Sequence, residues 1–531
     1  MLTPGAEAKK DATSRTPGIG DTAVKPGNVG ETTSGEVKAF GGTDGLLASN
    51  FAGPLDINGD TNLDICDNWD RFWQTGSDDI NGFISDWNDG TLDNAIPESL
   101  LAWPAKGNPH FSNQNGFESV SHYLAPFVDT NQDGIYDPED GDYPVIKGAD
   151  QAFFYVFSMV ETGVPSNEAY KVEVHTTCYA YTSNDPVIDV STFYDFQILN
   201  RSSFDLRNTY MAISIDPSLG CPTDDYFGCD TLNQMAFIYN EDDTDGQTGC
   251  SCSGGTTTFC NSIPMVGIKI LKGTTAGRLI EPDGSLSVPG PGVFDVDTFI
   301  NTGLSRFSYF NDGGVQPSPD PGTIDPNTSV EFYNYMNGKW IDGMPITIGG
   351  NGYDDNSTDY TNYAFHGDPS NGEEWSMCSE NLNTIDRKMM LSSGPFHLQP
   401  SQYNSMSMAI FHVAPVPHPC PSLDLLREGA NTITDLFDSF PTTTKEVARV
   451  ISNIRVAPNP FSNQTQLSLE NDQLAIQNIE LYNTSGQLMK SIKGLNRKSI
   501  VIKRNQLPTG LYFYKINTTN QQIISGKLMI Q

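Results

Sequence analysis

The chain has 531 residues, and 65 Asp and Glu against 30 Lys and Arg give it a formal net charge of −35. This length exceeds the roughly 250–300 residues at which a single core stops growing, so we expect several domains. The acidic excess argues against nucleic acid and anionic membranes as partners, because both carry charge of the same sign. No uninterrupted run of about 18 apolar residues occurs, so the sequence predicts no membrane-spanning helix.

Glycine and proline are abundant, at 49 and 34 residues, and aromatic residues make up 10% of the chain. So many turn-forming residues suit short strands better than long helices, and the aromatic residues suffice for a core. We therefore expect an all-β, multi-domain fold. It comprises a β-sandwich body with loop-rich segments of calcium-binding type and a small C-terminal immunoglobulin-like sandwich.

The first 50 residues are rich in Gly, Thr, Lys and Pro and offer little to bury. We expect this segment to be disordered or truncated. It also lacks the apolar centre of a secretory signal peptide, so an exported protein with this sequence has an incomplete N-terminus. Residues 51–150 follow as a loop-rich acidic region that contains four of the six tryptophans.

Within this region, residues 129–140 carry oxygen-bearing side chains at the spacing of an EF-type calcium loop. Gly134 stands at position 6, where such loops turn sharply, and position 12 is Asp instead of the usual Glu. The loop is similar to the calcium loops of thrombospondin type 3 repeats and dockerins, and a plain Asx-turn loop is the alternative. The predicted Ca²⁺ ligands are Asp129, Asn131, Asp133, Ile135 through its carbonyl, Asp137 and Asp140.

Residues 56–67 repeat this periodicity with Thr61 in place of the glycine. The predicted ligands there are Asp56, Asn58, Asp60, Asn62, Asp64 and Asp67. A third acidic group surrounds a Gly/Cys turn and comprises Asp216, Asp224, Asp225 and Asp230. Calcium at such sites is expected to be structural, because an oxygen cage fixes a long loop and offsets its ordering entropy. Exposed acidic loops that aid solubility are the alternative.

Residues 151–440 are expected to form the sandwich body. Runs rich in β-branched and aromatic residues predict strands at 153–157, 170–181, 187–199, 209–215, 234–239, 266–271, 389–391 and 403–413. Apolar residues at helical spacing predict one helix at 423–440, where the body ends. Residues 441–453 are expected to be a linker.

The nine cysteines favour disulfides over a metal site. Five of them lie in residues 221–260, without the Cys-x-x-Cys spacing or the neighbouring histidines of a zinc cluster. Disulfides indicate an oxidising compartment. An odd number leaves at least one thiol free or paired outside the chain, and the connectivity does not follow from the sequence.

The tail at 454–531 differs from the body in charge. Residues 452–531 hold 9 Lys and Arg against 3 Asp and Glu, which leaves 21 against 62 for residues 1–451. Alternating apolar residues predict a compact sandwich in which Leu467 and Leu469 share one face. Residues 483–486 predict a hairpin turn in which Gly486 supplies a positive φ.

Four motifs follow one another in this tail: Pro-Asn-Pro-Phe at 458–461, Tyr-Asn with a later glycine at 482–486, the segment 507–512, and Gly-Lys-Leu-Met-Ile-Gln at 526–531. In this order they resemble the type A sorting domain of the Bacteroidetes type IX secretion system, with a fibronectin-like module as the alternative. The resemblance implies that the type IX machinery exports the protein and that its sortase removes the tail. The protein is then released or anchored on a surface polysaccharide, and its expected location is secreted or on the outer-membrane surface.

The body also contains motifs that resemble an uncharacterised family of Bacteroidetes surface proteins. They lie at 66–72, 103–109, 141–151, 224–230 and 386–396. Members of that family carry similar tails, and the resemblance implies no activity. Its members have an ordered region before the Trp-Asp-Arg-Phe motif at 69–72, and this chain is expected to lack it.

The sequence contains no nucleophile elbow, His-Glu-x-x-His motif, P-loop or dinucleotide fingerprint. The 65 carboxylates do not single out a glycosidase pair. We therefore assign no catalytic residue and predict a non-catalytic, calcium-stabilised adhesin or glycan-binding protein. A secreted polysaccharide-acting hydrolase with an unrecognised carboxylate site is the alternative.

Overall fold

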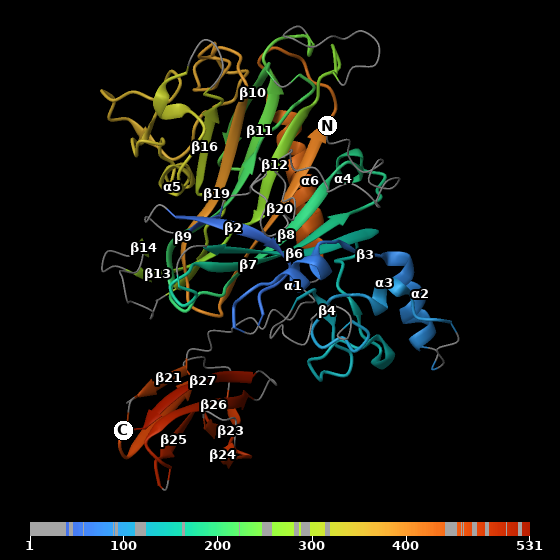
Figure 1. Ribbon diagram of the computed structural model, residues 1–531, viewed down its shortest axis with the longest axis vertical. Helices are drawn as coiled ribbons and strands as arrows, with labels where there is room; N and C mark the ends of the chain where they lie inside the picture. The colour runs from blue at the N-terminus through green and yellow to red at the C-terminus, as the bar shows by residue number, and fades with distance from the viewer. Residues whose placement is uncertain are drawn as a thin grey trace. The chain divides into compact units, whose positions relative to one another are not determined.

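The chain forms two compact units, Met1–Phe440 and Pro441–Gln531, in a computed structural model shown in Figure 1. The structure describes residues 39–41, 46–56, 58–88, 90, 94–111, 124–161, 165–221, 223–246, 258–280, 286–287, 298–313, 319–440, 454–457, 459, 461–469, 475–483, 488–505, 507–518 and 523–530. The expected linker at 441–453 and the N-terminal segment up to residue 38 lie outside these ranges. In the described residues, no helix has both the length and the apolar character needed to cross a membrane.

The body is built around a ten-stranded antiparallel sheet in the order β1-β2-β6-β7-β8-β20-β12-β11-β10, with β3 also paired to β6. Its strands are β1 Ala39–Gly41, β2 Leu46–Ala52, β3 Trp73–Gly76, β6 Gln151–Glu161, β7 Lys171–Ala180, β8 Thr192–Asn200, β10 Asp225–Asp230, β11 Met235–Asn240, β12 Met265–Lys272 and β20 Tyr403–Val413. Buried residues alternate along β6, whereas every residue of β10 and β11 is buried. The β10 end of the sheet is therefore covered on both faces.

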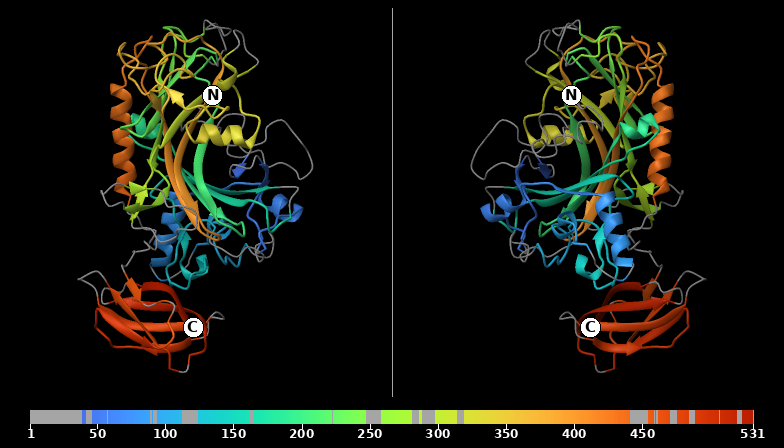
Figure 2. Two further views of the ribbon diagram at one scale, coloured as in Figure 1. Left: turned by 90° about the vertical axis from the view of Figure 1, so that its left-hand side faces the viewer. Right: turned by 90° about the vertical axis from the view of Figure 1, so that its right-hand side faces the viewer.

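A smaller sheet, β16-β19-β9, shares one hydrophobic core with the large sheet. Its strands are β9 Leu206–Ile215, β16 Arg306–Asn311 and β19 Arg387–Leu398. Helix α6, Asp424–Ser439, packs on β12 and β20 (Figure 2). The approach is close because Gly267 and Gly429 lack side chains: a Cβ on Gly267 would lie 2.6 Å from the Phe411 ring. These layers confirm the predicted sandwich body and its final helix.

Short elements complete the body. The helices are α1 Leu63–Trp69, α2 Ser77–Asn88, α3 Glu98–Leu101, α4 Pro186–Asp189, α5 Ser329–Met336, η2 Pro138–Asp140 and η3 Pro321–Thr323. The strands are β4 Phe127–Val128, β5 Tyr143–Pro144, β13 Thr275–Ile280, β14 Leu286–Ser287, β15 Thr298–Asn301, β17 Ile346–Thr347 and β18 Tyr360–Thr361. A second core around Trp69, Trp73 and Trp103 fixes the loops of the 51–150 region to β6.

Two local expectations differ from the structure. The strand expected at 187–199 begins only at Thr192, because Asp185 accepts the Val187 N–H at 2.9 Å and Pro186 opens the short helix α4. Within the segment expected to be disordered, β1 and β2 are strands. There, β2 pairs with β6 from Ala48 opposite Glu161 onwards, a tertiary interaction that composition alone does not reveal.

The tail unit is a sandwich of two antiparallel sheets, β21-β22-β25 and β24-β23-β26-β27. Its strands are β21 Ile454–Ala457, β22 Gln464–Leu469, β23 Ile476–Asn483, β24 Leu488–Ile492, β25 Ser499–Lys503, β26 Gly510–Thr518 and β27 Ile523–Ile530. Leu467 and Leu469 are buried in its own core, as predicted. The expected hairpin joins β23 to β24, and its turn at 484–487 lies outside the described residues.

Two of the tail motifs meet in space. Asn459 accepts the backbone N–H of Met529 at 2.8 Å, and the Phe461 N–H donates to the Met529 carbonyl at 2.9 Å. Asn459 and Phe461 of the Pro-Asn-Pro-Phe motif are therefore held against the terminal strand β27. Tyr512 donates to the Pro508 carbonyl at 2.9 Å, a backward bond from a buried tyrosine that is frequent in immunoglobulin-like sandwiches.

Candidate calcium loops and a buried carboxylate cluster

The 129–140 loop is closed at its base by a short β-hairpin. β4 pairs with β5 through Phe127 opposite Pro144 and Val128 opposite Tyr143, so the loop ends are held together. Asp129 Oδ2 accepts the Gly134 N–H at 2.8 Å. Gly134 has a φ of 80°, which favours glycine at this turn. The Asp129 side chain therefore folds back onto the loop.

The side chains of positions 3, 5 and 12 come together in this loop. Asn131 Nδ2 lies 3.2 Å from Asp133 Oδ2 and 3.4 Å from Asp140 Oδ2. Asn131 Oδ1 accepts the Asp133 N–H at 3.0 Å. Asp129 Oδ1 is buried and receives no hydrogen bond from the described part of the chain. Asn131, Asp133 and Asp140 thus share one cluster of hydrogen bonds, whereas the hydrogen bond of Asp129 joins it to the Gly134 N–H.

The other two predicted ligands are placed differently. Asp137 caps η2 by accepting the Glu139 N–H at 2.9 Å, and its Oδ1 lies 3.6 Å from His110 Nε2. Glu139 Oε1 is 3.9 Å from the same nitrogen, so Asp137 faces a histidine outside the loop. The Ile135 side chain packs against Gly107, where an added Cβ would lie 2.6 Å from Ile135 Cγ2.

Asp142 supports the loop and was missed by the sequence analysis. It is fully buried, and it accepts the N–H of Thr130 at 2.7 Å and the N–H of Asp137 at 3.1 Å. Burial raises the pKa of Asp142, and the charges of Asp129 and Asp133 add to the rise while the two N–H groups oppose it. The EF-type spacing did not indicate Asp142 because this residue lies two positions beyond position 12 of the loop.

The 56–67 segment keeps the loop conformation only in its first half. Asp56 Oδ1 accepts the N–H groups of Asn58 at 2.8 Å and Asp60 at 2.9 Å. Asn62 caps α1 by accepting the Ile65 N–H at 2.9 Å, and this helix contains both Asp64 and Asp67.

Asp60 already forms an ion pair with a lysine of the same chain. Its Oδ1 accepts from Lys171 Nζ and from Ser166 Oγ, both at 2.9 Å. Hydrogen bonds from Lys171 and Ser166 hold the pKa of Asp60 below its ordinary value. Calcium at this second loop remains a prediction, and it would compete with the Lys171 ammonium.

The third acidic group does not form one site. Asp224 and Asp230 lie at opposite ends of β10, about 20 Å apart for six extended residues. Asp230 accepts from Arg427 Nε at 2.8 Å. Asp224 instead lies beside Asp245, which the sequence analysis did not select. Burial, with the charge of Asp245 added, raises the pKa of Asp224 to about 7.

Comparison with known proteins identifies the tail. Residues 455–531 match the family described as the secretion system C-terminal sorting domain. This match supports the interpretation that the chain is a cargo protein of the type IX secretion system. The chain is therefore exported to the cell surface or secreted, and its tail contacts the type IX machinery. The resemblance of the body motifs to a surface-protein family remains a prediction.

The other comparisons assign nothing to the body. No curated protein is similar in sequence to this chain. A solved polysaccharide lyase aligns with 72% of the chain at 7% identity and a TM-score of 0.18. The aligned region spans 39% of the length of that enzyme. A likeness this weak does not bear on what the body binds or does.

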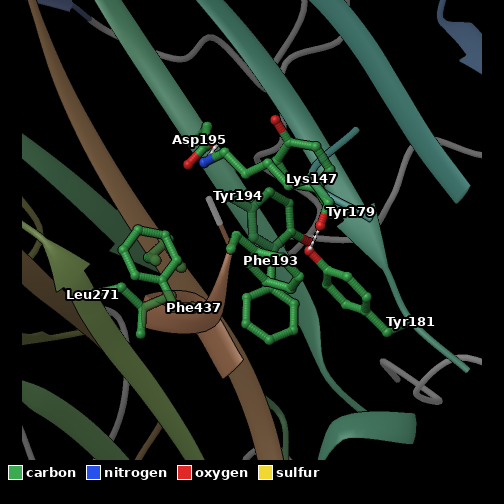
Figure 3. A pocket seen from close by; sticks show the side chains of 10 residues that line it. Lys147, Tyr179, Tyr181, Phe193, Tyr194, Asp195, Leu271 and Phe437 are labelled. Atoms are coloured by element: carbon green, nitrogen blue, oxygen red, sulfur yellow. Dashed lines mark hydrogen bonds and ion pairs between the residues drawn. The ribbon is translucent and has the colours of Figure 1, made fainter. Parts of the chain in front are cut away.

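A pocket between the large sheet and α6 has a lysine in its wall (Figure 3). Lys147 Nζ lies 2.5 Å from Asp195 Oδ2 and 5.4 Å from the centre of the Tyr179 ring. It also lies 5.3 Å from the centre of the Phe437 ring. The aromatic walls therefore already hold a cation that belongs to the chain. We assign no ligand to this pocket.

The cysteines agree with an oxidising compartment. Cys378 and Cys420 form a disulfide, and Cys221 is also disulfide-bonded. Cys66, Cys178 and Cys229 are buried free thiols, consistent with the odd number of cysteines. The sequence could not have indicated the 378–420 pair, because these residues are 42 positions apart and become neighbours only in the folded chain.

Proposed function

We propose that this exported protein has a non-catalytic adhesion or glycan-binding role and that Ca²⁺ in the 129–140 loop stabilises its body. The observation that supports calcium most directly is the Asp129 carboxylate. One oxygen accepts the Gly134 N–H, while the other is buried without a donor from the described residues. A hard cation at the loop interior satisfies such an oxygen, and oxygen ligands of this kind suit Ca²⁺.

Electrostatics favours a cation at the same place. The twelve loop residues include five carboxylates, at Asp129, Asp133, Asp137, Glu139 and Asp140. His110 Nε2 lies within 4 Å of Asp137 and Glu139 among these carboxylates in the described part of the chain. A divalent ion between Asn131, Asp133 and Asp140 lowers the remaining repulsion.

The loop is joined to the tryptophan core of the body. Tyr136, at position 8, is buried and donates to the Leu100 carbonyl at 2.8 Å. Trp103 Nε1 donates to the Pro126 carbonyl at 3.0 Å, directly before β4. Calcium that orders the loop therefore also orders the packing around Trp103. A rigid loop region of this kind suits an extracellular binding surface, because less ordering entropy is lost on binding.

We do not propose that the tryptophans of this core stack on sugar rings. Trp69, Trp73 and Trp103 are buried, and Trp69 and Trp73 pack against each other with ring centres 5.0 Å apart. They anchor loops, as buried aromatic side chains commonly do. A glycan-binding surface would have to use other side chains.

The calcium proposal is tested by melting the full chain in EDTA and in excess Ca²⁺. We expect Ca²⁺ to raise the melting temperature and Asp133→Asn to remove a large part of that increase. Asp354→Asn is the matched control, because Asp354 forms a similar exposed Asx turn by accepting the Asn356 N–H at 2.9 Å. An equal increase in all three proteins would rule out the 129–140 loop as the calcium site.

The adhesion proposal requires a separate experiment. The full chain is applied to a glycan array and to host-cell matrix proteins with Ca²⁺ and again with EDTA. Binding that is lost in EDTA and in Asp133→Asn supports the proposal. Turnover of a polysaccharide without measurable binding would instead favour the hydrolase alternative.

A further inference from the structure

A second group of carboxylates is buried at the start of β10. Asp224 precedes the strand and is 1% exposed, and Asp245 in the loop after β11 is fully buried. Their carboxylate oxygens and Cys221 Sγ lie within 4.8 Å of one another. β10 and β11 form one end of the large sheet (Figure 1).

The two carboxylates have different surroundings. Asp245 Oδ1 accepts the Cys221 N–H at 2.8 Å, and Oδ2 accepts the Phe259 N–H at 2.5 Å. Gly220 makes this close fit possible, because a Cβ there would lie 1.9 Å from Asp245 Oδ2. No well-formed hydrogen bond from the described residues reaches either oxygen of Asp224, although the backbone N–H groups of Asp224 and Gly246 lie close enough to oppose the rise in its pKa. Asp224 is thus a buried acid that points towards a second acid.

A single proton shared by Asp224 and Asp245 would not satisfy both oxygens of Asp224. Both oxygens of Asp245 already accept backbone N–H groups. A proton on Asp224 could bridge to Asp245, but it would leave the other Asp224 oxygen without a donor. Asp225, which is 2% exposed, adds a third buried carboxylate whose Oδ1 also lacks a donor among the described residues. A divalent cation can neutralise two charges and coordinate both oxygens of Asp224 at once.

We propose that Asp224 and Asp245 are ligands of a buried divalent-cation site that takes Ca²⁺. Cys221 is disulfide-bonded, so its sulfur is not the thiolate that a zinc site requires. Carboxylate oxygens without soft ligands favour a hard cation, and calcium is the one that binds through several carboxylates in flexible extracellular loops. The site uses none of the residues of the 129–140 loop and does not depend on calcium there.

The site links two segments that are distant in sequence. Asp245 forms a β-bridge with Cys260, and the Glu241 N–H donates to the Asp224 carbonyl at 2.8 Å. A cation between Asp224 and Asp245 therefore joins the start of β10 to the chain that returns from β11. This connection adds to the disulfide at Cys221 in the same region.

The test counts calcium ions on the full chain by titration calorimetry after removal of metal with EDTA. Variants are Asp224→Asn, Asp245→Asn and Asp133→Asn, and Asp243→Asn is the control for loss of a nearby exposed charge. We expect Asp224→Asn and Asp245→Asn each to lose the same calcium ion and to keep the one that Asp133→Asn loses. Asp243→Asn should keep both.

Three results are informative about the site. Unchanged calcium binding in folded Asp224→Asn would overturn the proposal and favour a proton shared by the two acids. If Asp224→Asn does not fold, the double variant Asp133→Asn/Asp56→Asn decides, because it removes a predicted ligand from each loop and must still retain a calcium ion that raises its melting temperature. Loss of all calcium in Asp133→Asn would overturn the buried site while leaving the loop site intact.

Discussion

Arg201 Nη1 donates to the carboxylate of Glu173 at 2.6 Å, where the Glu173 side chain is fully buried and the Arg201 side chain is 9% exposed. Glu173 also accepts from His175 Nε2 at 2.8 Å and from the Leu55 N–H at 2.9 Å. Arg201 donates in turn to the Asp56 carbonyl at 2.6 Å. The ion pair between Glu173 on β7 and Arg201, the residue after β8, thus fixes the chain where the 56–67 segment begins.

Glu173→Gln is expected to destabilise the body strongly. The glutamine keeps the shape but removes the negative charge that pairs with the Arg201 guanidinium, and breaking a buried ion pair typically costs about 3–5 kcal/mol. The free energy of unfolding is measured with urea in EDTA. Asp205→Asn is the control, since its pair with Arg207 is more exposed and such pairs contribute about 0–1 kcal/mol. Similar losses in the two variants would show that the buried pair has no special role.

The ion pair between Arg427 and Asp230 predicts that the stability of the fold decreases at acid pH. Burial alone would raise the pKa of Asp230, but hydrogen bonds from Arg427 and Asn233 outweigh it and hold this pKa below its ordinary value. The folded state therefore favours the ionised acid. This stabilisation is complete above the unfolded pKa of about 4 and is lost as the pH falls through the folded pKa.

The measurement is the melting temperature between neutral pH and about pH 3 in EDTA, for the wild type and Arg427→Gln. The variant should melt lower at neutral pH, and its loss of stability on acidification should be smaller. Arg207→Gln is a surface control. Parallel curves for wild type and Arg427→Gln would contradict the role of this pair.

Local patterns in the sequence were sufficient to predict much of the fold. β20 spans the predicted residues 403–413, and α6 differs from its prediction by one residue at each end. Both elements are long and periodic, so propensity and burial agree. α5 was missed although Thr328 and Glu331 form a capping box that the sequence displays. Its eight residues have too short an apolar pattern to stand out.

The candidate sites depended more on tertiary contacts. The 129–140 loop could be predicted as a calcium site because all its candidate side-chain ligands are close in sequence. Asp245 was missed because it approaches Asp224 only after β10 and β11 pair. Similarly, the Lys171 ammonium reaches Asp60 from β7 across 111 positions. No local spacing contains either relationship.

Gly267 is expected to tolerate no side chain. It lies on β12 under α6, where a Cβ would be 2.6 Å from the Phe411 ring and 3.3 Å from Leu426. Gly267→Ala should therefore lower the free energy of unfolding by about 1–3 kcal/mol through overpacking. Gly82→Ala on α2 is the matched control, because its added Cβ meets nothing within 4 Å and alanine favours a helix by about 0.5–1 kcal/mol. Stabilisation in both variants would mean that α6 does not lie as close to β12 as described.

The buried thiols of Cys178 and Cys229 are expected to resist alkylation in the folded protein. Burial raises the pKa of both thiols, with nearby Asp195 and Asp230 adding to the rise, so little reactive thiolate forms. Peptide mapping after iodoacetamide treatment should find both residues unmodified in buffer and modified in guanidinium chloride. Cys378 and Cys420 serve as internal controls, because their disulfide should block labelling in both conditions until a reductant is added. Rapid labelling of Cys178 in buffer would show that β7 opens in the native state.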